Sequence, residues 1–306
     1  MAAPRIAVLP PLEDIERAIL EAGGAPAPAE EADAIVWVNP RDPEGLRAAL
    51  AVSPARWVQL PFAGIEGFFE AGVIDPARTW TCTKGVYGPA TAEHALALIL
   101  TASRELHRHA RSRTWINNWE LSSRRLAGTT VLIVGTGGIG SALAEQLAPL
   151  GPRILAANRS GKPMERAQRT VAVARLDELL PEADWVVLAA PLTAETRNLI
   201  AAGALARMKS DAWVINVARG GLVDTDALVA ALREGRLGGA ALDVTDPEPL
   251  PDGHPLWEME NVIITSHAAN TFAMAIPELR EMVKHNVERF AKGEPLEGLI
   301  DVKLGY

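Results

Sequence analysis

The chain has 306 residues, enough for one large domain or two medium-sized ones. Its apolar fraction of 48% and charged fraction of 22% are typical of a globular protein with a sizeable core. A formal net charge of -8 argues against nucleic-acid binding, which requires a basic face.

Cys82 is the single cysteine, so the chain can form neither an internal disulfide nor a cysteine zinc cluster, and we expect a buried, inert thiol. The N-terminal sequence MAAPRIAVLPPLED lacks the long apolar core of a signal peptide. No stretch approaches ~18 apolar residues without charge, so no transmembrane helix is expected. We therefore predict a cytoplasmic protein without membrane contact.

In chain order, short runs rich in β-branched residues alternate with longer amphipathic runs. The first part of the chain predicts strands at Arg5–Leu9, Ala34–Val38 and Trp57–Leu60, with a helix at Ile15–Ala22. The next run, Thr91–His109, contains neither glycine nor proline, and its Ala and Leu residues predict one long helix.

The alternation then begins again. Strands are predicted at Thr130–Val134, Arg153–Ala156, Trp185–Ala189, Trp213–Val217, Gly239–Leu242 and Val262–Ile264. Helices are predicted at Ser141–Leu150, Ala201–Arg207, Thr225–Glu234 and Ala275–Lys292. This βαβα order predicts an α/β protein with two doubly wound parallel sheets, each covered by helices on both faces.

The segment VLIVGTGGIG, residues 131–140, carries the first functional signal. Gly135, Gly137 and Gly140 match G-x-G-x-x-G directly after a strand and at the start of a helix. In that context the glycines permit a tight turn, a close approach to a pyrophosphate and close helix–strand packing. The helix N-terminus then faces the phosphates. The segment therefore predicts a nicotinamide dinucleotide site, with Gly138 and Ile139 completing the turn.

The end of the second strand of this unit bears on the choice of cofactor. An NAD enzyme usually has an acid there, ~20 residues beyond the turn. This chain reads ILAANRSGK, with Asn158 at that position and Arg159, Ser160 and Lys162 after it. Asn carries no charge to repel a 2′-phosphate, and the three following side chains can donate to one. The loop predicts NADP(H). The alternative is a merely solvated loop that tolerates either NADP(H) or NAD(H).

Three later strands are each followed by polar side chains. WVINVARGGLVD offers Arg219, AALDVTDPEPL offers Asp243 and Glu248, and NVIITSHAAN offers His267. Ligands of open α/β sheets bind at the carboxyl ends of strands, so these groups are expected to converge there. An arginine can clamp a carboxylate, a histidine can exchange a proton near neutral pH, and a carboxylate can orient that histidine.

In order and at this spacing, the motifs GTGGIG, PLTAETRNLI, NVARGGLVDTDAL, ALDVTDPEPLPDGHPLW and TSHAAN resemble those of the D-isomer-specific 2-hydroxyacid dehydrogenase family. The resemblance implies that Arg219 binds the substrate carboxylate and carbonyl, and that Glu248 pairs with His267, the general acid/base. It also implies that Asp243 contacts the nicotinamide carboxamide. Further cofactor contacts are implied for Pro191, Thr196, Val217 and Ala218, and substrate-binding amides for Ala63 and Gly64.

The resemblance also implies the domain plan. A Rossmann domain, residues 96–274, is inserted into a flavodoxin-like substrate domain made of residues 1–95 and 275–306. Members of the family are usually homodimers paired through the cofactor domain. No metal site is expected.

The expected activity is reduction of a 2-oxo acid to a D-2-hydroxy acid, with glyoxylate and hydroxypyruvate as the first candidates. Phe62, in the lead-in PFAGIEG, keeps larger substrates open, and Asn270 in TSHAAN departs from the small residue common there. Two alternatives remain: a 3-phosphoglycerate dehydrogenase-like biosynthetic enzyme, and a non-enzymatic dinucleotide-sensing corepressor.

The other histidines and two of the tryptophans are not expected to have a catalytic or metal-binding role. His94 is expected to be a packing or capping residue, and His107 and His109 lack metal-ligand spacing. His254 and His285 are expected at the surface. Trp115 and Trp119 are expected to be core or interface anchors, and one of them could line the substrate pocket of a partner subunit.

Overall fold

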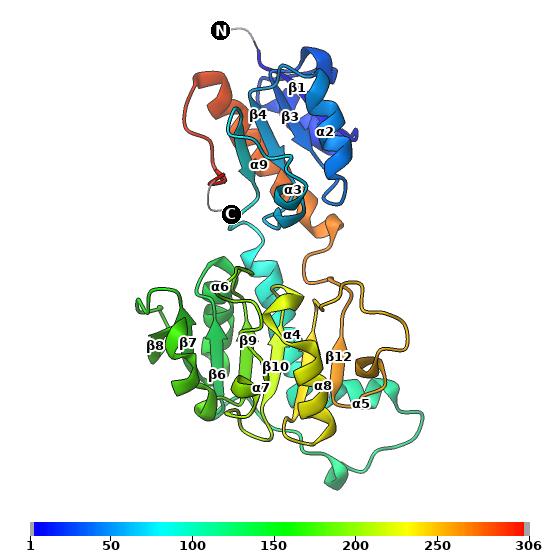
Figure 1. Ribbon diagram of the computed structural model, residues 1–306, viewed down its shortest axis with the longest axis vertical. Helices are drawn as coiled ribbons and strands as arrows, with labels where there is room; N and C mark the ends of the chain where they lie inside the picture. Colours follow the sequence, from blue (N-terminus) through cyan, green and yellow to red (C-terminus); the bar gives the residue numbers. More distant parts are fainter. Residues whose placement is uncertain (1–2, 303–306) are drawn as a thin grey trace. The chain divides into compact units, whose positions relative to one another are not determined.

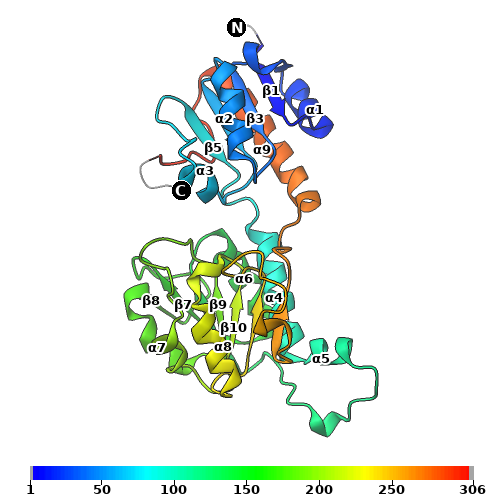
Figure 2. The same cartoon turned by 45° about the vertical axis from the view of Figure 1, so that its right-hand side comes forward.

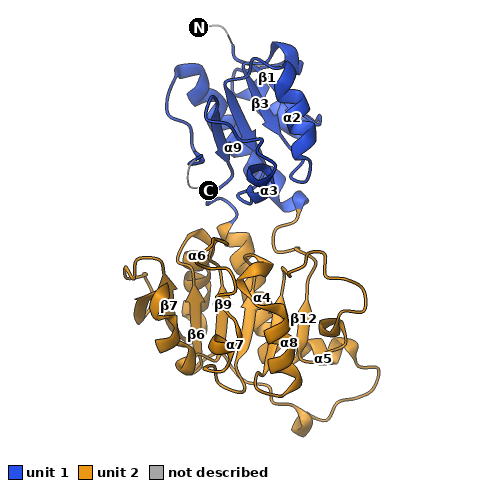
Figure 3. Ribbon diagram, in the orientation of Figure 1, with its two compact units in different colours: residues 1–87, 272–306 blue, residues 88–271 orange. Residues whose placement is uncertain are grey.

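The computed structural model describes residues 3–302. The chain forms two compact units, residues 1–87 with 272–306 and residues 88–271 (Figure 3). This division keeps helices α4 (Gly88–Ser103) and α9 (Phe272–Lys292) whole. The predicted domain boundaries, at 95/96 and 274/275, would pass through both helices.

The first unit is built on a five-stranded parallel sheet. Its strands are β1 (Arg5–Leu9), β2 (Ala25–Pro26), β3 (Ala34–Trp37), β4 (Trp57–Leu60) and β5 (Thr79–Cys82), in the spatial order β2-β1-β3-β4-β5. Its helices are α1 (Glu13–Glu21), α2 (Pro43–Val52), α3 (Glu66–Glu70) and α9. This order is that of flavodoxin-like folds, as predicted.

Two apolar clusters cover the two faces of this sheet. Ile15 of α1 packs with Val283 and Val287 of α9 on one face. Leu46 of α2 and Phe68 of α3 belong to the cluster on the other face. Helix α9, from the end of the chain, therefore helps to cover one face of a sheet whose strands all come from the beginning of the chain.

Cys82, the last residue of β5, is buried as expected. Burial raises the pKa of its thiol to about 11. Because a thiol reacts as the thiolate, Cys82 is an inert core residue near neutral pH.

The second unit contains a seven-stranded sheet in which every pairing is parallel. Its strands are β6 (Thr130–Val134), β7 (Arg153–Asn158), β8 (Arg169–Ala172), β9 (Trp185–Leu188), β10 (Trp213–Asn216), β11 (Gly239–Leu242) and β12 (Val262–Ile264). Its helices are α4, α5 (Leu106–Arg111), α6 (Gly138–Leu147), α7 (Ala202–Leu205) and α8 (Thr225–Arg233). Short 3-10 turns occur in both units, at Ala29–Glu31, Asn118–Glu120, Ala148–Leu150, Val173–Glu178, Leu180–Glu182, Gly220–Leu222 and Pro255–Trp257.

The spatial order β12-β11-β10-β9-β6-β7-β8 is the Rossmann order with one added strand (Figure 1). The chain winds outward from β6 in one direction through β7 and β8, and then in the other from β9 to β12. The strand order therefore reverses between β6 and β9, which is where ligands of such sheets bind.

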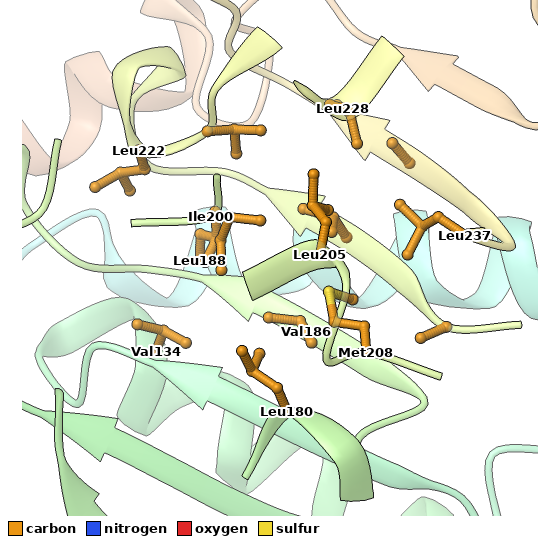
Figure 4. Close-up of a cluster of buried hydrophobic side chains, with 14 of the residues drawn as sticks. Val134, Leu180, Val186, Leu188, Ile200, Leu205, Met208, Leu222, Leu228 and Leu237 are labelled. Atoms are coloured by element: carbon orange, nitrogen blue, oxygen red, sulfur yellow. The ribbon is translucent and has the colours of Figure 1, made fainter. Parts of the chain in front are cut away.

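Helices cover both faces of this second sheet. On one face Leu205 of α7 and Leu228 of α8 pack with strand residues such as Val186 (Figure 4). On the other face Ala95 of α4 and Leu143 of α6 pack with a second set of strand residues. Because the central strands are buried on both sides, they appear in the sequence as continuous apolar runs.

The prediction of one long helix at Thr91–His109 is wrong in one respect. Glu105 has a φ of 53°, in the left-handed region, so α4 ends at Ser103 and α5 begins at Leu106. The Glu105 side chain accepts from Arg108, a local contact that stabilises the break. No glycine or proline marks this position, which is why the sequence pattern ran through it.

The tryptophans after α5 are not core residues. Trp115 is 91% and Trp119 is 83% exposed. They lie on a segment that leaves the body of the second unit after α5 (Figure 2). No helix among residues 3–302 is long and apolar enough to cross a membrane.

Candidate active site

Three of the predicted site residues follow three neighbouring strands. Arg219 follows β10, Glu248 follows β11 and His267 follows β12. Because all strands are parallel, the three residues leave the sheet at the same edge. That edge also carries the glycine turn, since Gly135 directly follows β6.

His267 and Glu248 form a direct pair. The distance from His267 Nδ1 to Glu248 Oε1 is 2.7 Å. The two side chains are 45% and 37% exposed, so the pair is reachable from solvent. With Nδ1 hydrogen-bonded to the carboxylate, Nε2 is the ring nitrogen that can exchange a proton with a ligand. This is the geometry of a general acid/base oriented by a carboxylate.

The backbone around His267 is unusual. Its φ is 53°, a left-handed conformation that non-glycine residues seldom adopt. The main-chain N–H of His267 donates to the carbonyl of Asp243 at 2.8 Å. The next two N–H groups, of Ala268 and Ala269, donate to the two carboxylate oxygens of Asp243 at 2.8 and 3.1 Å. Asp243 therefore holds three successive amides of the His267 turn.

Asp243 is itself buried, with 2% of its surface exposed. Burial alone would raise its pKa, but hydrogen bonds from His94, Thr265 and the two turn amides together lower that pKa below its usual value. The Asp243 carboxylate thus stays charged inside the protein. Its contacts within the chain support the His267 turn, and the predicted contact with a nicotinamide carboxamide stays a prediction.

Arg219 is positioned by a residue that the sequence analysis missed. Asn216, fully buried at the end of β10, donates from Nδ2 to the carbonyl of Arg219 at 2.9 Å. Its Oδ1 accepts from the N–H of Ala218 at 3.1 Å. The Arg219 guanidinium in turn donates from Nη1 to the Ala218 carbonyl at 2.7 Å. A sequence signal for this role was available, because Asn216 is the one polar residue in the otherwise apolar strand WVIN.

The glycine turn fits a dinucleotide pyrophosphate. Gly135 has a φ of 103°, and a Cβ there would lie 2.5 Å from the Ala189 carbonyl group. A Cβ on Gly140 would lie 2.0 Å from the Gly135 oxygen, so helix and strand pack in direct contact. A Cβ on Gly137 would meet nothing within 4 Å, which leaves that side of the turn open to a ligand. These three environments match the three glycine roles.

Helix α6 begins at Gly138, so Gly138 and Ile139 belong to its first turn. The predicted start, Ser141, was one turn late. The N–H groups of a helix's first turn have no partner within the helix and can bind an anion. Gly137 to Ile139 are therefore the residues that would hold the phosphates.

The cofactor loop is organised by Asn158. Its Oδ1 accepts from the N–H of Gly161 at 2.6 Å and of Ser160 at 3.1 Å. Its Nδ2 donates to the Lys162 carbonyl at 2.8 Å and to Thr136 Oγ1, in the glycine turn, at 3.1 Å. Asn158 thus ties the loop to the glycine turn.

The side chains that follow Asn158 in this loop, those of Arg159, Ser160 and Lys162, are exposed. A cofactor bound against this loop would meet these three side chains.

The remaining predicted cofactor contacts lie in the turns after β9 and β10. Thr196 Oγ1 donates to the Pro191 carbonyl at 2.7 Å and closes the turn after β9. Val217 and Ala218 are buried. These two residues can therefore offer a ligand their backbone groups rather than their side chains.

Ala63 and Gly64 lie in the first unit, between β4 and α3. The Phe62 ring beside them packs on the Tyr87 ring, with centroids 5.6 Å apart. Tyr87 Oη donates to the Pro61 carbonyl at 2.8 Å. The aromatic pair supports the loop that precedes Ala63, and substrate binding by Ala63 and Gly64 stays a prediction.

Two further residues near the His267 turn were not anticipated. His94, expected to be a packing or capping residue, has Nε2 2.9 Å from Thr265 Oγ1. Asn270 has both amide atoms buried without a hydrogen-bond partner among the described residues. Within residues 3–302, no group of three or more His, Cys, Asp or Glu side chains is arranged to hold a metal ion.

Comparisons with known proteins identify the family of this chain. Residues 96–269 match the family model described as "D-isomer specific 2-hydroxyacid dehydrogenase, NAD binding domain". A glyoxylate reductase of Thermofilum pendens is 38% identical over 72% of this chain and 67% of its own length.

Two solved structures are similar over nearly the whole chain. One is an NADPH-dependent glyoxylate/hydroxypyruvate reductase from Sinorhizobium meliloti in complex with NADP and sulfate. It has 27% identity and a TM-score of 0.81, and the match covers 99% of this chain and 100% of that one. The other is a D-lactate dehydrogenase with NAD+ from Lactobacillus jensenii, with 25% identity, a TM-score of 0.76 and 97% and 99% coverage.

Proposed function

Because this chain belongs to the D-isomer specific 2-hydroxyacid dehydrogenase family, whose members are NAD(P)-dependent oxidoreductases acting on CH–OH groups, we propose that it reduces a small 2-oxo acid to the D-2-hydroxy acid. Glyoxylate and hydroxypyruvate are the proposed substrates. The observation that carries the proposal is the His267–Glu248 pair at 2.7 Å, at the same sheet edge as Arg219.

Each residue has a defined task in this proposal. Arg219 binds the substrate carboxylate with its planar fork and polarises the neighbouring carbonyl. The reduced nicotinamide supplies the hydride when it is bound. His267 donates a proton from Nε2 to the oxygen of the former carbonyl, and Glu248 keeps the ring in the orientation that this transfer needs. The amides of Ala63 and Gly64 are proposed to bind the same carboxylate together with Arg219.

A panel of 2-oxo acids assayed by the absorbance of NADPH and NADH tests this function. We expect the highest kcat/KM with glyoxylate or hydroxypyruvate. A preference for 3-phosphohydroxypyruvate would favour the biosynthetic phosphoglycerate alternative. Cofactor binding without turnover of any member of the panel would contradict the proposal and favour a dinucleotide-sensing corepressor.

We propose NADP(H) as the preferred cofactor. Solved relatives carry NADP in one case and NAD+ in the other, so the family fold alone does not select between them. The selecting feature is the loop that Asn158 organises, which has no acidic side chain and presents Arg159, Ser160 and Lys162. A 2′-phosphate placed against this loop meets cationic and hydroxyl donors, where an NAD enzyme has an acid.

Replacing Arg159 tests this preference directly. Arg159→Leu should raise the Kd for NADPH ~10–100-fold, since a hydrogen bond to a charged group contributes roughly 1.5–3 kcal/mol. The Kd for NADH should change less than about twofold, because NADH has no 2′-phosphate for the lost side chain to contact. Titration of both cofactors by tryptophan fluorescence measures the two constants.

The control for that experiment is Arg153→Leu, at the opposite end of the same strand. Arg153 pairs with Glu182 at 2.7 Å and should leave both constants unchanged. Equal binding of NADH and NADPH by the unaltered protein would contradict the NADP(H) preference.

We also propose that the protein is a homodimer paired through the cofactor unit. Two observations support this. Trp115 and Trp119 expose most of their surface on the segment after α5, and exposed tryptophans are typical of interfaces. A hollow of about 470 Å³ lies in the same unit, at the amino ends of β9 and β10, where Trp185 and Trp213 line it. That end is opposite the glycine turn, so an interface there would not cover the cofactor.

The dimer proposal is tested by sedimentation equilibrium. The protein should have twice the mass of the chain, and the double variant Trp115→Ser/Trp119→Ser should dissociate at least about tenfold more readily, because interface tryptophans are frequent hot spots. Trp257→Ser, which removes an exposed tryptophan elsewhere in the unit, is the control. A single-chain mass at every concentration would overturn the proposal.

A further inference from the structure

The catalytic turn is held in a conformation that its own sequence does not favour. His267 is neither glycine nor asparagine, and its φ of 53° costs free energy relative to an extended or helical backbone. Such a residue persists only where its surroundings hold it in place. The position of the imidazole therefore depends on the groups that hold this turn.

Asp243 provides the hydrogen-bond acceptors that hold this turn. Its carbonyl and both carboxylate oxygens take the N–H groups of His267, Ala268 and Ala269. One carboxylate oxygen, Oδ1, also accepts from Thr265 Oγ1 at 2.6 Å. Asp243 can fix the turn only while its carboxylate stays in this orientation inside the protein.

His94 completes this arrangement from another element. It lies on α4, and its Nε2 is 2.9 Å from Thr265 Oγ1 and 3.3 Å from Asp243 Oδ1. The Thr265 hydroxyl has one proton, which it gives to Asp243, so its oxygen accepts from His94. His94 must therefore carry its proton on Nε2. His94 thus brings a basic side chain within ion-pair distance of Asp243.

Helix α4, which carries His94, is well packed against the sheet. Ala92 and Ala95, close to His94 on this helix, are fully buried and belong to the same cluster as Ala241 of β11 and Ile263 of β12. The His94 side chain is only 21% exposed. The network thus links a packed helix to the loop after β12.

We propose that His94 is a positioning residue for the reaction, and that the network His94–Thr265–Asp243 holds the turn that aims His267 at Glu248 and at the substrate. This inference rests on the proposed acid/base role of His267. His94 does not exchange a proton with the substrate in this scheme. It keeps Thr265 and Asp243 in the orientation that fixes the strained turn.

Three variants test the network. His94→Leu removes the donor and should lower kcat about 10–100-fold, because small misplacements of a catalytic group have effects of that size. The KM and the Kd for NADPH should stay within about twofold. His94→Gln has an amide nitrogen near the position of Nε2 and should recover most of the lost activity. Thr265→Val, which removes the connecting hydroxyl, should resemble His94→Leu.

A second readout does not depend on activity. Hydrogen exchange of the amides of residues 267–269 reports how firmly Asp243 holds the turn, and it should accelerate in His94→Leu and Thr265→Val. The double variant should be no worse than either single one, because both changes break the same connection. His285→Leu, at an exposed histidine on α9, is the matched control and should behave like the unaltered protein.

The outcomes separate the two proposals. If His94→Leu keeps both its kcat and its slow exchange, or if His94→Gln is as impaired as His94→Leu, the positioning role is overturned. Additive losses in the double variant would also overturn it. If instead His267→Ala remains active, the acid/base assignment fails, while the exchange measurement still decides whether His94 holds the turn.

Discussion

Replacing His267 with Ala should lower kcat by about 10²–10⁴-fold, which is the usual contribution of a positioned general acid or base. The physical reason is that the oxygen formed from the substrate carbonyl would have to take its proton from water. The Kd for NADPH should change little, because the groups that would bind the phosphates lie at the glycine turn after β6. Steady-state kinetics with glyoxylate and a fluorescence titration measure the two effects.

The matched control is His109→Ala, which removes an exposed histidine from α5 of the same unit. It should leave kcat and cofactor affinity unchanged. Turnover by His267→Ala within about threefold of the unaltered protein would show that another group supplies the proton. The hydrogen bond between His267 and Glu248 would then have a structural role and not a catalytic one.

The second large effect is expected at Arg219. Arg219→Leu should lower kcat/KM by about 10²–10⁴-fold, because two charge-assisted hydrogen bonds to the substrate carboxylate, each roughly 1.5–3 kcal/mol, are lost together. Most of this should appear as a higher KM. A smaller part should appear in kcat, since the guanidinium also polarises the carbonyl.

Arg219→Lys separates charge from geometry. It keeps the positive charge but not the planar fork, so it should recover only part of the loss. Arg197→Leu, at an exposed arginine in the same unit, is the control and should be near neutral. An unchanged kcat/KM in Arg219→Leu would exclude the carboxylate clamp, whatever the result at His267.

The central strands and the positions of the candidate site residues at their ends could be predicted from the sequence because their signals are local. Val131 to Val134 form a buried parallel strand, which appears as an unbroken apolar run, and the glycines after it have roles set by backbone geometry alone. His267 and Glu248 were found because both follow such strands. Their pairing at 2.7 Å required the neighbouring positions of β11 and β12 in the sheet.

Short and irregular elements were missed for physical reasons. Helix α2 begins with Asp42 as N-cap, whose carboxylate accepts from Gly45 at 2.7 Å, and with Pro43 in its first turn. Those are start signals, but Leu46 and Leu50 are the buried residues of the helix, so its apolar pattern is short. Strand β8 at Arg169–Ala172 is an edge strand with a polar start and little apolar pattern.

Contacts between distant parts of the chain gave no signal in the sequence. His94 was expected to pack or cap because nothing in its helix shows that Thr265, far along the chain, lies 2.9 Å away. Asn216 and Asn158 act on the backbone of neighbouring residues, and such roles depend on loop conformation. The exposure of Trp115 and Trp119 follows from where the chain goes after the break at Glu105.

The location of the acid/base pair and the glycine turn within residues 88–271 has a consequence for how such a protein can change. The hydrogen bonds described above for Arg219, Glu248 and the His267 turn come from residues of that unit, whereas Ala63, Gly64 and Phe62 belong to the segment before it. Under the proposed contact of Ala63 and Gly64 with the substrate, substitutions in the loop after β4 should change the substrate preference more than the proton transfer. In that proposal a new specificity requires changes in one short loop, and the residues proposed for proton transfer stay the same.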